Sequence, residues 1–144
     1  MTAQDEPLDS PVDWVAEHAR HYIDTDGAEG HLWRGAPTLA LTTTGRRSGQ
    51  RHRTMLIYGQ DGARYLVVAS KGGAPQHPAW YLNLLAHPEV EVQVRGERFR
   101  ARARPATAEE KLRLWQLMTA IWPAYDDYQT KTRREIPVVI LERI

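Results

Sequence analysis

Cysteine is absent from this chain, and so is any long hydrophobic run. Without cysteine the protein has no disulfide framework, no thiolate nucleophile and no cysteine-ligated metal site. The longest apolar runs, Leu66–Ala69 and Val138–Leu141, are far shorter than the ~20 residues of a membrane-spanning helix and are typical of buried strands. The first residues also lack the basic start and apolar stretch of a signal peptide. We therefore expect a cytoplasmic protein.

The chain also has no large excess of charge of one sign: it contains 19 Lys and Arg residues and 18 Asp and Glu residues. A nearly neutral chain is a poor candidate for a nucleic-acid-binding protein, so no nucleic-acid partner is expected. The charges are nevertheless segregated. Residues 1–30 hold eight acidic residues and one basic residue, whereas residues 45–71 hold six basic residues and one acidic residue. A local basic segment in a neutral protein indicates one anionic ligand bound at one place.

The chain is 144 residues long, the usual size of one domain. Residues 1–9 are polar and are expected to be disordered, and residues 10–144 are expected to form a single domain. Hydrophobic periodicity predicts an amphipathic helix over residues 11–23 and a short helix that begins at Pro78. A later helix is predicted to begin with a capping box of Thr107 and Glu110 and to end before Pro123.

Alternating or β-branched stretches predict six strands, which fall at residues 38–43, 54–58, 65–70, 90–94, 98–104 and 137–141. Most of these strands follow one another through hairpin-length turns, and Asp61-Gly62 is a typical turn pair. The fold class predicted is therefore α+β: a six-stranded, mostly antiparallel β-barrel with flanking helices.

The segment Thr42–Gly49, followed by Arg51 and Arg53, is the first candidate site. Its two glycines allow a tight turn with exposed backbone N–H groups, and Arg46, Arg47 and Ser48 add charge and a hydroxyl donor. Such a set binds phosphate or carboxylate oxygens. It is not a P-loop, because the Gly-x4-Gly-Lys-Ser/Thr pattern is missing. A solvated basic turn is the alternative.

A glycine-rich segment, Ala69-Ser70-Lys71-Gly72-Gly73, is the second candidate. It follows a buried strand and precedes Trp80 and Tyr81, and paired glycines let backbone approach a flat ligand closely. A flexible turn before a helix is the alternative.

Aromatic residues near the C-terminus are the third candidate. Trp115 fits the apolar face of its helix, whereas Tyr125 and Tyr128 lie beyond Pro123 in a polar, mobile segment with no evident core role. Half-exposed aromatic side chains of this kind line ligand pockets, with structural packing as the alternative.

Two other groups of residues carry no site prediction. The six histidines are scattered without a His-x-x-x-His zinc pair, so no metal site is predicted. Arginines alternate along residues 98–104, but neighbouring glutamates favour a solvated outer strand over a nucleic-acid surface.

Three segments together resemble the deazaflavin-dependent nitroreductase family of actinobacteria, across about residues 32–144. They are Thr43–Gly49, Ala69–Pro75 with His77–Leu84, and Tyr125–Gln129 through Ile136–Val138. The resemblance implies a split β-barrel that binds the deazaflavin coenzyme F-420. It also implies an oxidoreductase that uses the reduced coenzyme as hydride donor to a quinone, a nitroaromatic or an activated enone.

The resemblance assigns roles to residues of this sequence. Arg46, Arg47, Ser48 and Arg53 would hold the phosphate and glutamyl tail of the coenzyme. The remaining coenzyme contacts implied are Thr54, Leu56, Tyr58, Ala69, Ser70, Lys71, Gly72, Gly73, Trp80, Tyr81 and Asn83. Trp122, Tyr125 and Tyr128 would line the acceptor pocket, and Ser70, Tyr125 and Tyr128 would donate to the acceptor during catalysis.

Several positions depart from the pattern of many family members. Arg47 stands where lysine is common, His52 where arginine is common, Met55 where proline is common, and Trp122 where tyrosine is frequent. These departures concern the choice of acceptor more than the coenzyme. An FMN-binding split barrel and a non-catalytic deazaflavin carrier are the alternatives. A monomer or homodimer is expected, with at most transient contact at the inner face of the plasma membrane, because the acidic first 30 residues repel anionic lipids.

Overall fold

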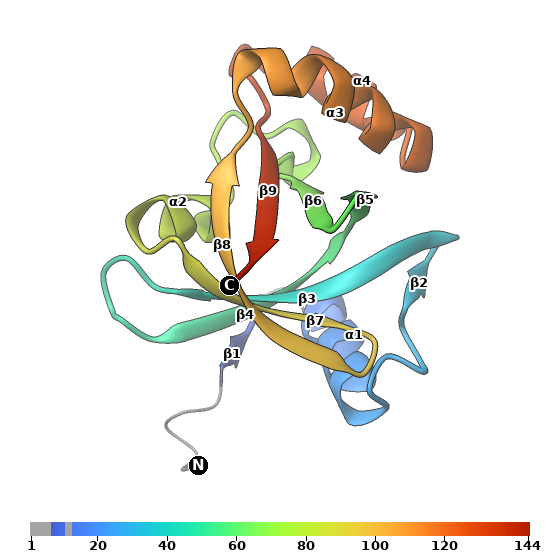
Figure 1. The fold of residues 1–144 in the computed structure, drawn as a ribbon, viewed down its shortest axis with the longest axis vertical. Coiled ribbons are helices and arrows are strands. Elements are labelled where there is room, and N and C mark those ends of the chain that lie inside the picture. The colour runs from blue at the N-terminus through green and yellow to red at the C-terminus, as the bar shows by residue number, and fades with distance from the viewer. Residues whose placement is uncertain (1–6, 11–12) are drawn as a thin grey trace.

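A computed structural model describes residues 7–10 and 13–144. The strands are β1 (Leu8–Asp9), β2 (Leu32–Trp33), β3 (Ala36–Thr44), β4 (Arg51–Ile57), β5 (Gly59–Asp61), β6 (Arg64–Val68), β7 (Glu89–Val94), β8 (Glu97–Pro105) and β9 (Val138–Arg143). The helices are α1 (Asp13–Asp24), α2 (Ala79–Ala86), α3 (Ala108–Ile121) and α4 (Ala124–Thr130), with a 3-10 turn at Lys71–Gly73 (Figure 1). The α+β class predicted from sequence is confirmed.

The described strands form one open sheet rather than a six-stranded closed barrel. Its order is β1-β4-β3-β7-β8-β9-β6-β5, with β2 paired to β3 beside this path. The β1–β4 pair is parallel and the other pairs are antiparallel, so the sheet is mixed and has nine strands. The prediction of six strands was wrong because β1, β2 and β5 have only two or three residues each, too few to show alternation.

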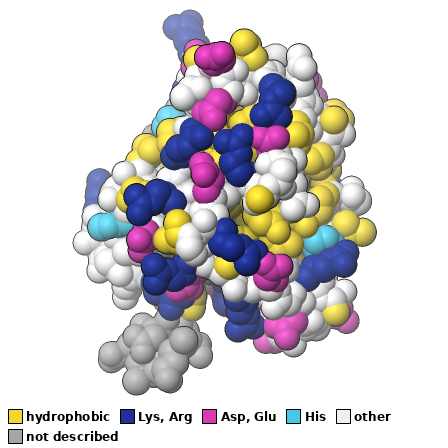
Figure 2. Space-filling view, viewed as in Figure 1, with side chains coloured by type: hydrophobic (Ala, Val, Ile, Leu, Met, Phe, Trp, Pro, Cys, Tyr) yellow, Lys and Arg dark blue, Asp and Glu magenta, His cyan; other side chains and the backbone are white. Residues whose placement is uncertain are grey.

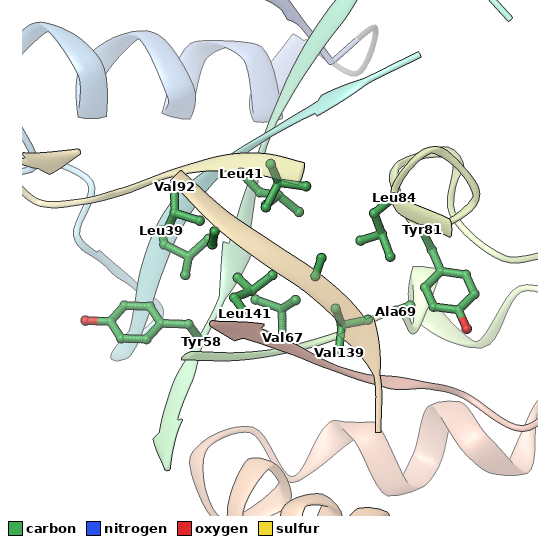
Figure 3. Close-up of a cluster of buried hydrophobic side chains, with 13 residues drawn as sticks. Leu39, Leu41, Tyr58, Val67, Ala69, Tyr81, Leu84, Val92, Val139 and Leu141 are labelled. Atoms are coloured by element: carbon green, nitrogen blue, oxygen red, sulfur yellow. The ribbon is translucent and has the colours of Figure 1, made fainter. Parts of the chain in front are cut away.

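Continuous apolar runs in β6 and β9 reflect burial on both faces of the sheet. Val67 and Leu141 face the main core with Leu39 and Val92, a cluster that Figure 3 shows between the strands and α2. The alternate residues of the same strands face a second cluster beneath α3 and α4; its buried members are Leu66, Val68, Leu114, Met118, Tyr125, Ile136, Val138 and Ile140. Because successive side chains of a strand point to opposite faces, β6 and β9 each contribute residues to both cores.

Helix α3 begins as the sequence predicts. The Thr107 hydroxyl accepts from the Glu110 N–H, and the Glu110 carboxylate accepts from the Thr107 N–H. Pro123 ends α3 but opens α4, a helix that the sequence prediction treated as an irregular segment. Because α4 is only seven residues long, periodicity could not reveal it. Both helices lie across one end of β8 and β9 (Figure 1).

The N-terminal segment differs from the prediction where it is described. Residues 1–6 lie outside the described residues, but Leu8–Asp9 form β1 and pair with His52 and Arg53 of β4. The prediction of disorder was therefore wrong for these two residues, since their backbone groups complete the edge of β4. Helix α1 agrees with its prediction from Asp13 onward, and residues 11–12 lie outside the described part.

Arginines on β8 form the solvated face that the sequence predicted. Arg98 pairs with Asp26, and Arg100 and Arg102 both approach Glu89. Figure 2 shows basic and acidic side chains interspersed over the face in view. Such exposed pairs contribute little stability individually.

Within residues 7–10 and 13–144, no helix has the length and hydrophobicity needed to cross a membrane.

Candidate functional site

An open cleft of about 480 Å³ lies between β4, the loop after β3 and the N-terminal end of α2. Its walls combine several basic side chains with one carboxylate and an indole ring. The lining residues are Leu8, Asp9, Ser10, Gly45, Arg46, Arg47, Ser48, His52, Arg53, Thr54, Lys71, Pro78, Ala79, Trp80 and Asn83. The two candidate segments around Gly45 and Lys71, separate in sequence, therefore meet in one site.

The loop after β3 is held in shape by its own hydrogen bonds. The Gly45 N–H donates to the Gln50 carbonyl at 2.7 Å, and the Gly49 N–H donates to the Gly45 carbonyl at 3.0 Å. A side chain at Gly45 would lie 2.7 Å from the Ser48 hydroxyl, and Gly49 has a φ of +72°. The loop needs both glycines to form this tight turn.

Asn83 connects α2 to this loop. Its side chain is 5% exposed, and its Oδ1 accepts from the Arg46 backbone N–H at 3.2 Å and from Arg46 Nη1 at 3.0 Å. The Asn83 amide nitrogen donates to the Thr43 hydroxyl at 3.4 Å. A buried neutral amide thus fixes the direction of an exposed guanidinium without cancelling its charge.

Arg53 is held by an ion pair, whereas Arg46 is held by a neutral amide. Its Nε and Nη2 donate to the two carboxylate oxygens of Asp9 at 2.7 and 3.1 Å. Both side chains are largely buried and both line the cleft. Sequence reasoning missed Asp9 because its contact with Arg53 depends on the two-residue parallel pairing of β1 with β4.

The glycine-rich turn brings Lys71 to the cleft in an unusual backbone conformation. Lys71, Gly72 and Gly73 have consecutive positive φ values of 46°, 63° and 83°. At Gly73 a side chain would lie 2.5 Å from the Tyr128 carbonyl oxygen, whereas at Gly72 no described atom lies within 4 Å. The turn therefore packs its backbone directly against α4. Strained conformations of this kind concentrate at functional sites.

Arg134, which the sequence prediction did not include, lies beneath the same turn. Its guanidinium donates to the carbonyl oxygens of Ser70 at 2.7 Å, Ala74 at 2.9 Å and Ala69 at 3.2 Å. No local sequence signal marks this arginine, since its partners lie about 60 residues away in the chain.

The structure brings about half of the predicted coenzyme residues to the cleft: Arg46, Arg47, Ser48, Arg53, Thr54, Lys71, Trp80 and Asn83. It places the others away from the cleft walls: Leu56, Tyr58, Ala69, Ser70, Gly72, Gly73 and Tyr81. Tyr58 and Tyr81 belong to the main core, at opposite ends of the cluster in Figure 3. Conversely, the cleft includes Leu8, Pro78 and Ala79, which the sequence did not single out.

The C-terminal aromatic residues form a separate group on the far side of the glycine-rich turn. Tyr125 is only 4% exposed and packs against Trp115 and Tyr128, so the expectation of a half-exposed side chain on a mobile segment was wrong for it. Burial raises the pKa of Tyr125 far above its ordinary value. Tyr128 is half-buried, and Trp122 Nε1 donates to its hydroxyl at 3.5 Å.

Two further indoles extend this group outward. The Trp33 ring lies 5.2 Å from the Trp122 ring, and Trp14 stacks on Trp33 at 5.7 Å. Trp14 remains 56% exposed. Trp33 of β2 and Trp14 of α1 thus extend the aromatic group beside Trp122, which is predicted to line the pocket for the electron acceptor. These three indoles are distant in sequence and meet only in the folded chain.

The composition of the cleft defines the kind of ligand it fits. The cleft has one carboxylate, Asp9, and four basic side chains, those of Arg46, Arg47, Arg53 and Lys71. This excess of positive charge suits the anionic tail of a ligand. Trp80 with Pro78 and Ala79 offers a flat apolar surface for a ring. The composition of the cleft therefore suits an anionic cofactor with an aromatic ring system.

The chain matches the model of the F420H(2)-dependent quinone reductase family over residues 14–143, and it belongs to that family. It is 45% identical over 130 residues to an F420H(2)-dependent quinone reductase of Mycobacterium tuberculosis, covering 88% of this chain and 87% of that protein. A solved structure described as a domain-swapped dimer superposes with a TM-score of 0.71, at 41% identity, over 92% of this chain and all of that one. The F420-H2 dependent reductase FDR-A gives a TM-score of 0.69 at 42% identity, over 74% of this chain and 94% of that one.

Proposed function

We propose that this protein transfers a hydride from reduced coenzyme F-420 to a quinone. The observation that carries the proposal is the cleft in which Arg46, Arg47, Arg53 and Lys71 surround an indole-lined surface, in a member of this family. When bound, the reduced coenzyme supplies the hydride. The protein supplies the binding site, the orientation of the two reactants and the exclusion of water.

The basic loop after β3 would hold the anionic tail of the coenzyme. Arg46 is directed by Asn83, and the Ser48 hydroxyl, which accepts from the Gln50 N–H, adds a neutral donor. Charge-assisted hydrogen bonds to phosphate and carboxylate are about twice as strong as neutral ones. Lys71 and Trp80, which also line the cleft, would border the ring.

Tyr128 is the proposed proton donor to the acceptor oxygen, and Ser70, which lies off the cleft walls, is the second donor that the resemblance implies. Tyr128 is half-buried, lies beside Trp122 and contacts the glycine-rich turn through its backbone, close to Gly73. A phenol hydroxyl can donate a hydrogen bond or its proton to a developing oxyanion. Tyr125, which the resemblance also placed in this role, is buried behind Tyr128 and supports its ring instead.

A binding titration tests the coenzyme. Quenching of tryptophan fluorescence is expected with coenzyme F-420 and not with FMN, because Trp80 lines the cleft. The reduced coenzyme is then mixed with menadione, a nitroaromatic and an activated enone, and its absorbance is followed. Rapid oxidation with menadione supports the proposal. Tight binding without turnover on any acceptor would show a carrier, and preferential FMN binding would show a flavin enzyme.

We propose a homodimer as the assembled state. The support is the similarity over 92% of this chain to a structure described as a domain-swapped dimer. Light scattering coupled to size-exclusion chromatography is expected to give twice the mass of the 16.5 kDa chain. A mass equal to the chain would contradict it.

A further inference from the structure

Arg134 lies between α4 and β9, and its guanidinium faces neutral acceptors. Three backbone carbonyls of residues 69–74 accept from it, and its Nη1 lies 3.1 Å from His77 Nδ1. Within residues 7–10 and 13–144, no carboxylate lies within ion-pair distance of it. Burial lowers the pKa of Arg134, so its charged form is held there at a cost. A surface arginine with a purely solvating role would not be placed in this way.

The strand ladder ends before the turn, so the turn carbonyls have no partner among the described strands. The β6–β9 pairing finishes at Val68–Val138, and one more bond joins the Ala69 N–H to the Pro137 carbonyl. Beyond that point the chain passes through three residues with positive φ. A planar guanidinium can donate along several directions at once and satisfy carbonyls that no strand can reach.

Arg134 is also anchored to α4, the helix that carries Tyr128, the proposed donor to the electron acceptor. Gln129 of α4 donates from Nε2 to the Arg134 carbonyl at 2.8 Å, and its Oε1 accepts from the Ile136 N–H at 2.9 Å. Gly73 packs against the Tyr128 carbonyl on the same helix. Arg134 therefore contacts the turn with its side chain and α4 with its backbone.

We propose that Arg134 is a positioning residue: it fixes the turn at residues 69–74, and with it the relation between Lys71 in the cleft and Tyr128 on α4. The catalytic half of this inference rests on the proposed function, whereas the ordering of the turn does not. Because hydride transfer is sensitive to displacements of about 1 Å, a loosened turn lowers turnover even when both ligands still bind.

The test compares Arg134→Lys and Arg134→Gln with Arg133→Gln, an exposed neighbour that loses the same charge. In coenzyme-free protein, amide hydrogen exchange over residues 69–76 is expected to rise about tenfold or more in both Arg134 variants and to stay unchanged in Arg133→Gln. At saturating coenzyme, kcat with menadione is expected to fall about tenfold or more, with a smaller change in KM. Lysine does not restore either readout, because one ammonium cannot reach three carbonyls.

Chemical rescue separates positioning from general stability. Methylguanidinium, added below unfolding concentrations to Arg134→Ala, is expected to recover part of kcat and of the exchange protection. Unchanged exchange in both Arg134 variants, or an unchanged kcat, would overturn the proposal. If the variants do not fold, fast exchange of the Gly73 and Ala74 amides in the unmodified protein would overturn it, and slow exchange would support it. Failure of the unmodified protein to oxidise reduced coenzyme F-420 would instead refute the proposed function, and the exchange result would still stand.

Discussion

Asp9 and Arg53 form a bidentate ion pair inside the cleft, with N–O distances of 2.7 and 3.1 Å. The pair is set by the parallel register that places Asp9 opposite Arg53. Its carboxylate occupies donors that an anionic tail would otherwise use. An acidic side chain from the N-terminal segment would thus compete with an anionic ligand for one of the cleft's arginines.

Replacing Asp9 with asparagine is expected to tighten binding of coenzyme F-420 by about threefold to tenfold, since one opposing charge leaves the cleft and Arg53 is freed. The measurement is the dissociation constant from tryptophan fluorescence. Asp61→Asn is the matched control, because Asp61 also pairs with arginines, Arg64 and Arg113, but away from the cleft. Weaker binding by Asp9→Asn would mean that the pair instead holds Arg53 in its binding position.

Two adjacent glycines offer a test of the contact between the turn and α4. Gly73→Ala is expected to lower the free energy of unfolding by about 3 kcal/mol, through its positive φ and the overlap with the Tyr128 carbonyl. Gly72→Ala has open space around it and is expected to lose about 1 kcal/mol from conformation alone. Urea denaturation measures both. Equal losses would indicate that the close approach at Gly73 is not a constraint.

The two tyrosines of α4 are expected to respond differently to loss of the hydroxyl. Tyr128→Phe should lower kcat for menadione about tenfold or more, because it removes a proton donor. Tyr125→Phe should leave kcat within about twofold, since that ring serves as packing. Steady-state kinetics at saturating coenzyme provides the comparison. A larger loss in Tyr125→Phe than in Tyr128→Phe would reverse the assignment.

Acid sensitivity is expected at the start of α3. Hydrogen bonds from Arg104 and the Thr107 N–H lower the pKa of Glu110 from 4.5 to about 2. A carboxyl group whose pKa is lower in the folded chain than in the unfolded chain stabilises the fold at pH values above its unfolded pKa. This contribution is lost as the pH falls from about 4.5 towards 2. Thermal melts over that range should show a shallower decline for Glu110→Gln than for the unmodified chain. Identical slopes would exclude the linkage.

About half of the predicted coenzyme residues line the cleft, and the signals that marked them are local in sequence. The glycines and arginines between Gly45 and Arg53, and the glycines at 72 and 73, mark tight turns with exposed donors through their residue types alone. The capping box at Thr107, another local signal, was confirmed. Each of these signals depends on neighbours within a few residues.

Long-range contacts escaped prediction for the opposite reason. Asp9 meets Arg53 through a two-residue strand, and Arg134 meets residues 69–74 across about 60 positions of chain. The burial of Tyr125 was hidden because a seven-residue helix among polar side chains gives no period. Nothing in the local pattern distinguishes these residues from solvated ones.

By itself, then, the sequence determined the α+β class, the basic loop suited to an anion and the glycine-rich turn, because composition and backbone freedom are properties of short segments. Tertiary structure alone decided that the sheet is open and mixed, that Asp9 shares the cleft, and that Arg134 supports the turn from beneath. The physical reason is that pairing and burial energies arise between segments distant in the chain, and they select partners that no local pattern specifies.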